Sequence, residues 1–560
     1  MVGALMSMVG REIRGMHHAA YVLAGFALGS QLLALVRDRL LAAHFGAGHT
    51  LDLYYAGFRI PDLLFATVAS LLSLYALLPV LSKFEAESQG QMVSFLRHTL
   101  LFFFVAMGVI SLVLFFFVPK LVLLVAPGLS DAASRVDLVP LIRILLLQPI
   151  LLGASNIVAA LTQLRHRFLL YSISPLLYNV GIIFGIVALY PRFGLAGLGW
   201  GVVLGAAMHF LVQVPFFSAE KSEHLPAPIR WKGLAQVLAL SVPRTLALAA
   251  GQLSLLALVA LASLLSPGSI AVFMFAWNLQ AVPLTIIGVS YSVAAFPTLA
   301  RFHASGEREA FVGHIEAALR HIFFWSIPAM VLAVVLRAQL VRIILGAGAF
   351  DWVATRLTAA ALALFVLSLT AQSVVLLFAR AYYAAGKTKT PLVMGMVSVI
   401  VTVASALILS FGFHASQFWR FFLESILRVS DVGGTTVLML ALSFTIGSLL
   451  QATGALLYLK KEFHISYAGL SRLAFQSFSA AVLGGAAAYG ALAAVGLVVD
   501  INTVAGITTQ GVLGGIVGLL ATGGMLLALG NPEIAEAYAS IKRRFEGEPQ
   551  VALEPTDVSS

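Results

Sequence analysis

Cysteine is absent from this chain of 560 residues. Its absence excludes disulfide bonds, thiol catalysis and zinc sites with cysteine ligands. Charged residues are scarce as well: they make up 10% of the chain, against about 25% in an ordinary soluble domain. So little charge cannot cover the surface of a protein in water, so a single soluble globular fold is excluded.

Long apolar segments make up most of the chain. Hydrophobic residues make up 60% of the chain, and apolar stretches of roughly 20 residues, each long enough to cross a ~30 Å hydrocarbon core as a helix, recur along almost its whole length. The short alternating segments of a membrane β-barrel do not occur, so helices must satisfy the backbone inside lipid. We therefore expect an all-α polytopic membrane protein with about fourteen transmembrane helices.

The positive charge of the chain is explained by membrane topology. The formal net charge is +10, but the basic residues lie in short loops between apolar runs and form no single patch, so no nucleic acid partner is expected. If the N-terminus is cytoplasmic, the inside segments hold 22 of the 34 lysine and arginine residues. Because basic residues accumulate in cytoplasmic loops, both termini are predicted to be cytoplasmic.

A weak internal repeat predicts two lobes. Residues 79–84 read Pro-Val-Leu-Ser-Lys-Phe, and residues 297–302, 218 positions later, read Pro-Thr-Leu-Ala-Arg-Phe. Six expected helices separate the copies, so both run in the same direction and the halves are related by an axis along the membrane normal. We expect two six-helix lobes around a central cavity (1–225 and 226–464), two additional transmembrane helices (465–530) and a cytoplasmic tail (531–560).

One segment between the expected spans is amphipathic. Residues 415–432 carry several aromatic side chains, and Arg420, Glu424 and Arg428 are available for the opposite side. A helix of this kind lies in the plane of a membrane surface rather than crossing it. We expect the segment to lie on the outer interface.

The first two spans contain a cluster of charged residues. Charges within membrane spans are costly, so they face a protein interior or a wet cavity and mark the path of a substrate or an ion. An arginine and aspartate network that only holds two helices together is the alternative. The charged residues are Arg37, Asp38, Arg39, Asp52, Arg59 and Asp62.

Uncharged polar residues extend this candidate site into the other lobe. Asn278 occupies the corresponding stretch of the second lobe, and Gln31 and Gln252 lie in the first and seventh spans. No histidine has the spacing of a metal ligand with a carboxylate, and no nucleophile is paired with a base. We therefore expect no catalytic residue, metal or cofactor. The predicted substrate-binding residues are Arg37, Asp38, Asp52, Arg59, Gln31, Asn278 and Gln252.

At these residues the chain resembles a known family of transporters. The similar motifs are Arg37-Asp38, then Phe-Gly-Ala-Gly at 45–48, Asp52 with its aromatic neighbours, and Phe-Arg-Ile-Pro-Asp-Leu-Leu at 58–64. Further similarities lie at 126–128, 346–350 and 387–391. They resemble the MviN/MurJ family, the lipid II flippases of the multidrug/oligosaccharidyl-lipid/polysaccharide exporter superfamily.

The resemblance implies a fold, a substrate and a location. The implied fold has fourteen helices, with two six-helix lobes around a V-shaped cavity. The implied activity is transport of lipid II, a lipid-linked oligosaccharide, across the cytoplasmic membrane of a bacterium without ATP hydrolysis, in cell-wall biosynthesis. Cavity cations would hold the pyrophosphate by charge-assisted hydrogen bonds. Membrane lipids, and possible contacts with the cell-wall synthesis machinery, are the implied partners.

The chain departs from the family pattern at three positions. Gln31, Phe65 and Asn278 stand where family members usually carry arginine. The substrate could therefore be another polyprenyl-pyrophosphate-linked glycan, and a cation-coupled drug exporter of the same superfamily is a more distant alternative. A membrane glycosyltransferase is disfavoured, because the expected outer loops are short and their carboxylates scattered. A scaffold without transport activity is disfavoured to the same degree.

Overall fold

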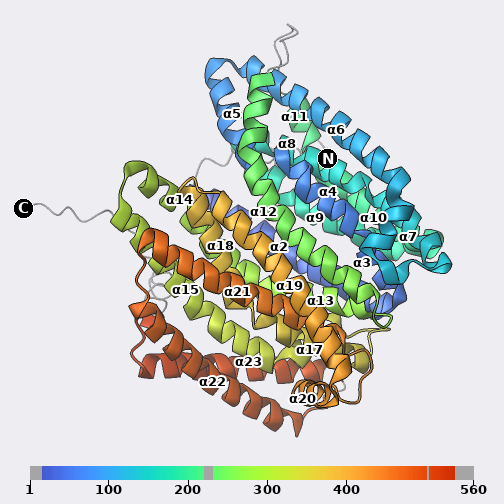
Figure 1. Ribbon diagram of the computed structural model, residues 1–560, viewed down its shortest axis with the longest axis vertical. Coiled ribbons are helices and arrows are strands. Elements are labelled where there is room, and N and C mark those ends of the chain that lie inside the picture. Colours follow the sequence, from blue (N-terminus) through green and yellow to red (C-terminus); the bar gives the residue numbers. More distant parts are fainter. Residues whose placement is uncertain (1–15, 73, 166, 220–230, 501–502, 536–560) are drawn as a thin grey trace, which may run out of the picture.

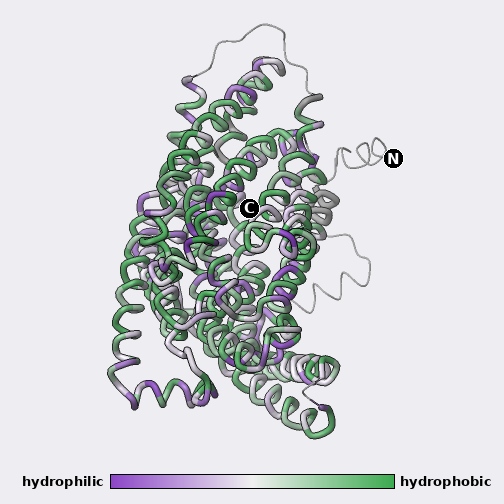
Figure 2. Tube along the Cα trace, turned by 90° about the vertical axis from the view of Figure 1, so that its right-hand side faces the viewer, coloured by the Kyte–Doolittle hydropathy of each residue, from purple (hydrophilic) through white to green (hydrophobic). Residues whose placement is uncertain are grey.

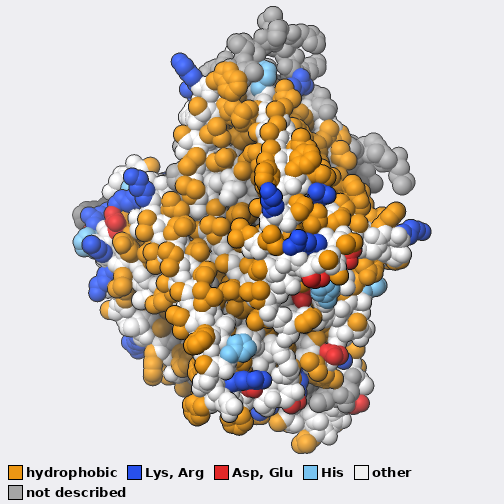
Figure 3. Space-filling model, turned by 45° about the vertical axis from the view of Figure 1, so that its right-hand side comes forward, with side chains coloured by type: hydrophobic (Ala, Val, Ile, Leu, Met, Phe, Trp, Pro, Cys, Tyr) orange, Lys and Arg blue, Asp and Glu red, His pale blue; other side chains and the backbone are white. Residues whose placement is uncertain are grey.

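The computed structural model describes residues 16–535, except 73, 166, 220–230 and 501–502. All regular elements in these residues are helices, and they form an elongated bundle in which most long helices run in roughly the same direction (Figure 1). Hydrophobic residues follow the helices along most of their length (Figure 2) and cover much of the face that Figure 3 shows. The predicted all-α polytopic class is confirmed.

The first half of the chain contains a tight helical hairpin. Its helices α9 and α10 reverse direction at Gly194, whose φ is +56°. Gly185 and Gly201 face each other across the hairpin, where a Cβ on Gly201 would lie 2.4 Å from the Cα of Gly185. The small-residue cluster at 194–201 is thus a helix-packing surface, as its composition predicts. The elements of this half are α2 (Met16–Phe45), α3 (His49–Gly57), α4 (Arg59–Thr67), η1 (Ala69–Leu72), α5 (Leu74–Glu87), α6 (Gln89–Val125), η2 (Pro127–Leu129), α7 (Ala132–Leu145), α8 (Leu147–Leu164), α9 (Phe168–Phe184), η3 (Gly185–Leu189), α10 (Tyr190–Leu211) and α11 (Val214–Ala219).

The second half begins with a long helix, α12, that packs against both halves. Near its start Gly233 lies against Phe84, and the Ser70 hydroxyl donates to Thr245 Oγ1 at 3.0 Å; its later part packs on α19. The predicted boundary at 225/226 lies outside the described residues and stays a prediction. The elements are α12 (Trp231–Ser263), α13 (Ser269–Leu284), η4 (Thr285–Val289), α14 (Ser290–Ser305), α15 (Arg308–Val335), α16 (Arg337–Leu345), α17 (Trp352–Val366), α18 (Leu369–Ala384), α19 (Lys389–Ala415), α20 (Gln417–Leu427) and α21 (Val437–Phe463).

Two further helices complete the bundle. Helices α22 (Ala468–Gly496) and α23 (Val504–Ala528) pack closely on each other, and α22 also packs on α15 (Figure 1). Gly484 and Gly518 permit the close approach, since a Cβ on Gly484 would lie 2.7 Å from the Gly518 carbonyl oxygen. The tail from 536 lies outside the described residues.

The two copies of the repeat have similar surroundings. The Phe84 ring lies 4.8 Å from the ring of Phe95 at the start of the next helix, and the Phe302 ring lies 6.1 Å from that of His314. Each copy also follows an irregular turn, η1 in the first half and η4 in the second. These parallels agree with the repeat, but the lobe bounds drawn from it stay predictions.

The helical stretches that can span a membrane differ in length. Among the described residues, nine helical stretches are long and apolar enough to cross a membrane, or ten if α17 and α18, which meet at 45°, form one span. One of the nine, Leu169–Phe217, has 49 residues and contains the α9 and α10 hairpin, about twice the length that one crossing needs. The expected count of fourteen therefore stays a prediction.

Candidate functional site

Arg37 and Asp38 form the centre of the candidate site. The Arg37 Nε and Nη2 groups donate to Asp38 Oδ1 at 3.0 and 2.8 Å, and Nη1 donates to Asn179 Oδ1 in α9 at 3.1 Å. Asp38 is buried, whereas the Arg37 side chain is 20% exposed. A guanidinium has five N–H groups, and these contacts with described residues use three of them. Arg37 can thus bind a further acceptor.

Asn278 connects this pair to the second half of the chain. Its Nδ2 group, in α13, donates to Asp38 Oδ2 at 3.1 Å. Asp38 therefore accepts hydrogen bonds from both halves, two from Arg37 and one from Asn278. The amide adds no charge where the family resemblance leads us to expect an arginine, so the positive charge of Arg37 is balanced by Asp38 alone within this network.

Asp52 binds the start of a helix in the other half. Its Oδ2 accepts from the Gly268 N–H at 2.5 Å and its Oδ1 from the Ala271 N–H at 2.8 Å, and the side chain is 3% exposed. The first N–H groups of a helix lack partners within the helix and form the positive end of its dipole, so a carboxylate is stabilised there. Gly268 has φ +89°, and a Cβ would lie 2.1 Å from the Ala47 carbonyl oxygen, so only glycine fits.

Arg39 makes the complementary contact at the end of another helix. Its Nη1 group donates to the carbonyl oxygens of Ile343 at 2.5 Å and Ile344 at 3.3 Å, in the last turn of α16. The C-terminal carbonyls are the negative end of a helix dipole, so a cation is stabilised there. Two side chains of the first half thus bind helix ends of opposite charge in the second half: Asp52 binds the N-terminus of α13, and Arg39 binds the C-terminus of α16.

These contacts close one end of the bundle. We call this region the closed end: residues 39–52 and Gly128 of the first half with residues 263–271 and 343–354 of the second. The Ala349 N–H also donates to the Ala43 carbonyl oxygen at 2.9 Å, and the Gly128 N–H donates to Ser263 Oγ at 3.0 Å. Separating the two halves at this end requires breaking all of these bonds.

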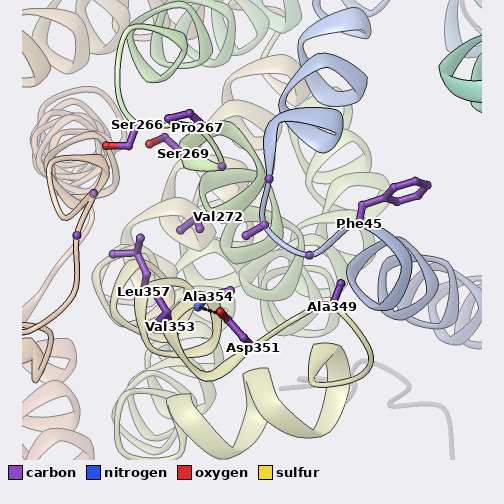
Figure 4. Close-up of a pocket in the computed structure, with 16 residues that line it drawn as sticks. Phe45, Ser266, Pro267, Ser269, Val272, Ala349, Asp351, Val353, Ala354 and Leu357 are labelled. Atoms are coloured by element: carbon purple, nitrogen blue, oxygen red, sulfur yellow. Dashed lines mark hydrogen bonds between the residues drawn. The ribbon is translucent and has the colours of Figure 1, made fainter.

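A pocket of about 460 Å³ lies between the two halves at the closed end (Figure 4). Small residues from both halves line it, among them Gly46 and Ala349, and its lining includes Asp351. The Asp351 carboxylate already accepts from the Ala354 N–H at 2.8 Å and caps α17. The pocket does not include Arg37 or Asp38, so it marks the junction of the halves rather than the charged network.

Arg59 lies apart from the junction. Its Nε group donates to the Tyr55 carbonyl oxygen at 3.2 Å and its Nη2 to Asp62 Oδ2 at 3.3 Å, both in the same half. Arg59 is 5% exposed, and its Nη1 is buried without a partner among the described residues. The pair fits a structural role in the second span, and a direct role of Arg59 in binding stays a prediction.

The remaining predicted residues do not join the network. Gln31 and Gln252 are half-buried in α2 and α12, and neither contacts Arg37 or Asp38 by a hydrogen bond among the described residues. Phe65, at a position where family members usually carry arginine, packs against the hydrophobic core. The structure thus brings together Arg37, Asp38 and Asn278, and it holds Asp52 at a separate contact.

The sequence did not reveal three contributors to this region. Asn179 looks like an ordinary interhelical hydrogen-bond partner, yet it contacts Arg37 directly. The direction of Arg39 could not be inferred. The N–H groups that bind Asp52 belong to the backbone, and the only sequence signal for them is the run Ser-Pro-Gly-Ser at 266–269, which is typical of a turn that leads into a helix.

Known proteins match this chain over most of its length. A family model described as "Lipid II flippase MurJ" matches residues 41–501, a range that begins just after Arg37 and Asp38. A relative named lipid II flippase MurJ from Burkholderia cenocepacia is 28% identical over 400 residues, 69% of this chain and 77% of the relative. A probable lipid II flippase MurJ from Thermotoga maritima is 27% identical over 405 residues, 70% of this chain and 80% of the relative.

Solved structures agree with the fold. A structure of lipid II flippase MurJ in an inward closed conformation covers 91% of this chain and 99% of its own, with 20% identity and a TM-score of 0.67. An inward-facing multidrug resistance transporter of the MATE family, in the MOP superfamily, covers 78% of this chain and 94% of its own, with 13% identity and a TM-score of 0.64. With the family model matching far more than half of its residues, this chain belongs to the lipid II flippase MurJ family.

Proposed function

We propose that this protein is a flippase that carries lipid II from the inner to the outer leaflet of the cytoplasmic membrane of a bacterium, for cell-wall biosynthesis. Family membership supports the proposal. The observation that carries it is Arg37, a partly exposed guanidinium with unused donors at the contact between the two halves. A transporter of this kind catalyses no chemical step, so the protein is not an enzyme.

Arg37 can bind the pyrophosphate of the substrate. Phosphate oxygens accept the paired N–H groups of arginine in charge-assisted hydrogen bonds. The headgroup would share Arg37 with Asp38 or displace the carboxylate, while the polyprenyl tail stays in lipid. Because Asp38 also accepts from Asn278, a change at Arg37 alters a contact with the second half. Substrate binding is thereby linked to the relative position of the halves.

Transport requires the closed end to open. In alternating access, two halves of a transporter rock about a central site, so that the site faces each side in turn. The contacts of Asp52 and Arg39 hold one end shut. With both termini in the cytoplasm, as the distribution of basic residues favours, the closed end faces outward. The headgroup then enters from the cytoplasmic side and leaves after the closed end separates.

A second substrate has one observation in its favour. Positions 31, 65 and 278 hold Gln, Phe and Asn, so fewer cations than usual are available for a large anionic headgroup. Another polyprenyl-pyrophosphate-linked glycan would need the same Arg37 contact with its pyrophosphate. A drug exporter has no need for that contact. Binding to the cell-wall synthesis machinery is compatible with either lipid substrate.

Complementation separates these possibilities. The intact chain should restore growth to a bacterium depleted of its own lipid II flippase, and Arg37→Ala should not, while both are present in the membrane at equal levels. Arg192→Gln is a matched control, because Arg192 is exposed and, among the described residues, its one hydrogen bond goes to the Ala188 carbonyl oxygen one helical turn away. Failure of the intact chain to complement would overturn the lipid II assignment, and growth with Arg37→Ala would overturn the role of Arg37.

A further inference from the structure

Helix α20 presents an aromatic face to the outside of the molecule. Phe418, Phe421, Phe422 and Ile426 are 78%, 67%, 45% and 59% exposed. Their spacing of three and four residues places them on one side of the helix. The rings of Phe418 and Phe422 lie nearly parallel, with centroids 6.3 Å apart. An apolar patch of this kind is unfavourable in water and marks a surface that contacts something else.

The opposite side of α20 is fixed to the protein. Leu423, Glu424 and Leu427 are buried. The Glu424 Oε1 atom accepts from Arg420 Nε at 2.9 Å and from the Thr435 hydroxyl at 2.6 Å. At its N-terminus the Ser416 hydroxyl oxygen accepts from the Trp419 N–H at 3.3 Å. The helix therefore holds its exposed face in a defined position.

The exposed face continues a surface that already faces lipid. Helix α19, which leads into α20, is apolar enough to span a membrane, and its outer side ends in Ile408 and Phe411, which are 69% and 77% exposed. In Figure 1 α20 is seen nearly end-on, whereas α12 and α19 run across the picture. Helix α20 thus turns across the direction of the spans at the point where the lipid-facing surface of α19 ends.

Charged and aromatic side chains at its C-terminal end suit a membrane surface. Arg428, which ends α20, donates from Nη2 to the Tyr489 hydroxyl of α22 at 3.1 Å, and both side chains are exposed. Arginine and tyrosine are favoured at the level of lipid headgroups, where a charged or polar tip meets phosphate and water while the rest of the side chain contacts apolar chains. A buried protein interface tends instead to exclude charges from its core.

We propose that α20 is an interfacial helix, with Phe418, Phe421, Phe422 and Ile426 inserted among the phospholipid headgroups and upper acyl chains of the leaflet at the closed end. The partner is the lipid surface itself, and the inference does not depend on which substrate the protein carries. Because Thr435 ties α20 to the segment before α21, the helix fixes the second half of the closed end at a set depth in the membrane.

Spin labels on the full chain test this proposal. The protein has no cysteine, so Phe418→Cys, Phe421→Cys and Phe422→Cys each give one labelling site on an exposed position. Phe411→Cys on α19 serves as the lipid control and Ser430→Cys, exposed in the following loop, as the water control. Each labelled protein is reconstituted into vesicles of phosphatidylcholine and phosphatidylglycerol. Electron paramagnetic resonance then measures collisions with oxygen, which concentrates in lipid, and with a water-soluble nickel chelate.

The proposal predicts an oxygen-to-nickel collision ratio at 418, 421 and 422 several-fold above that at Ser430 and below that at Phe411, as for a shallow position in lipid. A ratio equal to that at Ser430 would mean that the face is in water and would overturn it. Labels shielded from both reagents would mean that a protein, including a second copy of this chain, covers the face, and this too would overturn it.

Discussion

Replacing Asp52 by asparagine should open the closed end. The amide keeps one oxygen for an N–H of α13 but turns an NH₂ group toward the other, so one charge-assisted hydrogen bond is lost and the second becomes neutral. Hydrogen bonds to charged groups contribute about 1.5–3 kcal/mol, and a charge at a helix end about 0.3–1 kcal/mol. A loss of about 2–3 kcal/mol lowers the ratio of closed to open molecules by roughly 30- to 150-fold.

The assay measures the separation of the two halves. Nitroxide labels at Val136→Cys in α7 and Val353→Cys in α17, which are 72% and 53% exposed, report the distance across the closed end by pulsed electron resonance. The doubly labelled protein with Asp52 unchanged should give mainly the short distance. Adding Asp52→Asn should produce a second, longer distance. Asp62→Asn is the matched control, because Asp62 is also a carboxylate of the second span but pairs with Arg59 in the same helix.

Two results would refute the reasoning. An unchanged distance distribution in Asp52→Asn would mean that the helix cap does not hold the halves together. An equal shift in Asp62→Asn would mean that loss of any carboxylate in this span disturbs the bundle, and that the contact with α13 has no special role.

Three further changes have distinct expected outcomes. Arg39→Gln should weaken the same closed end by about 1–2 kcal/mol and lower the ratio of closed to open molecules roughly 5- to 30-fold, measured with the same labels. Its effect should add to that of Asp52→Asn, because the two side chains bind different helices. Gly201→Ala should destabilise the detergent-solubilised protein by about 1–3 kcal/mol through overpacking, which lowers its melting temperature. Gly251→Ala, whose added Cβ meets no atom within 4 Å, should leave the melting temperature unchanged. Equal effects of the two substitutions would contradict the packing argument. Arg356 lowers the pKa of Asp431. The stabilisation from this ion pair is therefore present above the ordinary carboxyl pKa and is lost as the pH falls through the lowered pKa. The melting temperatures of wild type and Asp431→Asn should differ at pH 7 and converge in strong acid, and a constant difference would contradict this.

The class of fold was predictable because it rests on local properties. Long apolar runs exclude a soluble domain and force helices, and glycines at spacings of a helical turn mark close helix contacts such as that of Gly185 with Gly201. The internal structure of the spans was not predictable. The second span is divided into α3, α4, η1 and α5, and nothing in its apolar pattern except Pro61 indicates a break.

The candidate site was predictable in its residue types but not in its pairings. A costly charge in a span indicates that Arg37, Asp38 and Asp52 have partners, but it does not name them. Arg39 binds backbone carbonyls 304 and 305 positions away, and Asp52 binds an N–H 216 positions away. Backbone groups have no side-chain signature in the sequence. Such pairings require the three-dimensional arrangement.

The central claim is that Arg37 holds the pyrophosphate of a lipid substrate during its passage. The most direct test is translocation of fluorescent lipid II across vesicles that contain the purified chain, with Arg37→Ala and Arg37→Lys as variants that both insert and fold. The account predicts transport by the wild type, partial transport by Arg37→Lys, which keeps the charge without the paired donors, and none above empty vesicles by Arg37→Ala. Transport by Arg37→Ala at the wild-type rate would contradict it.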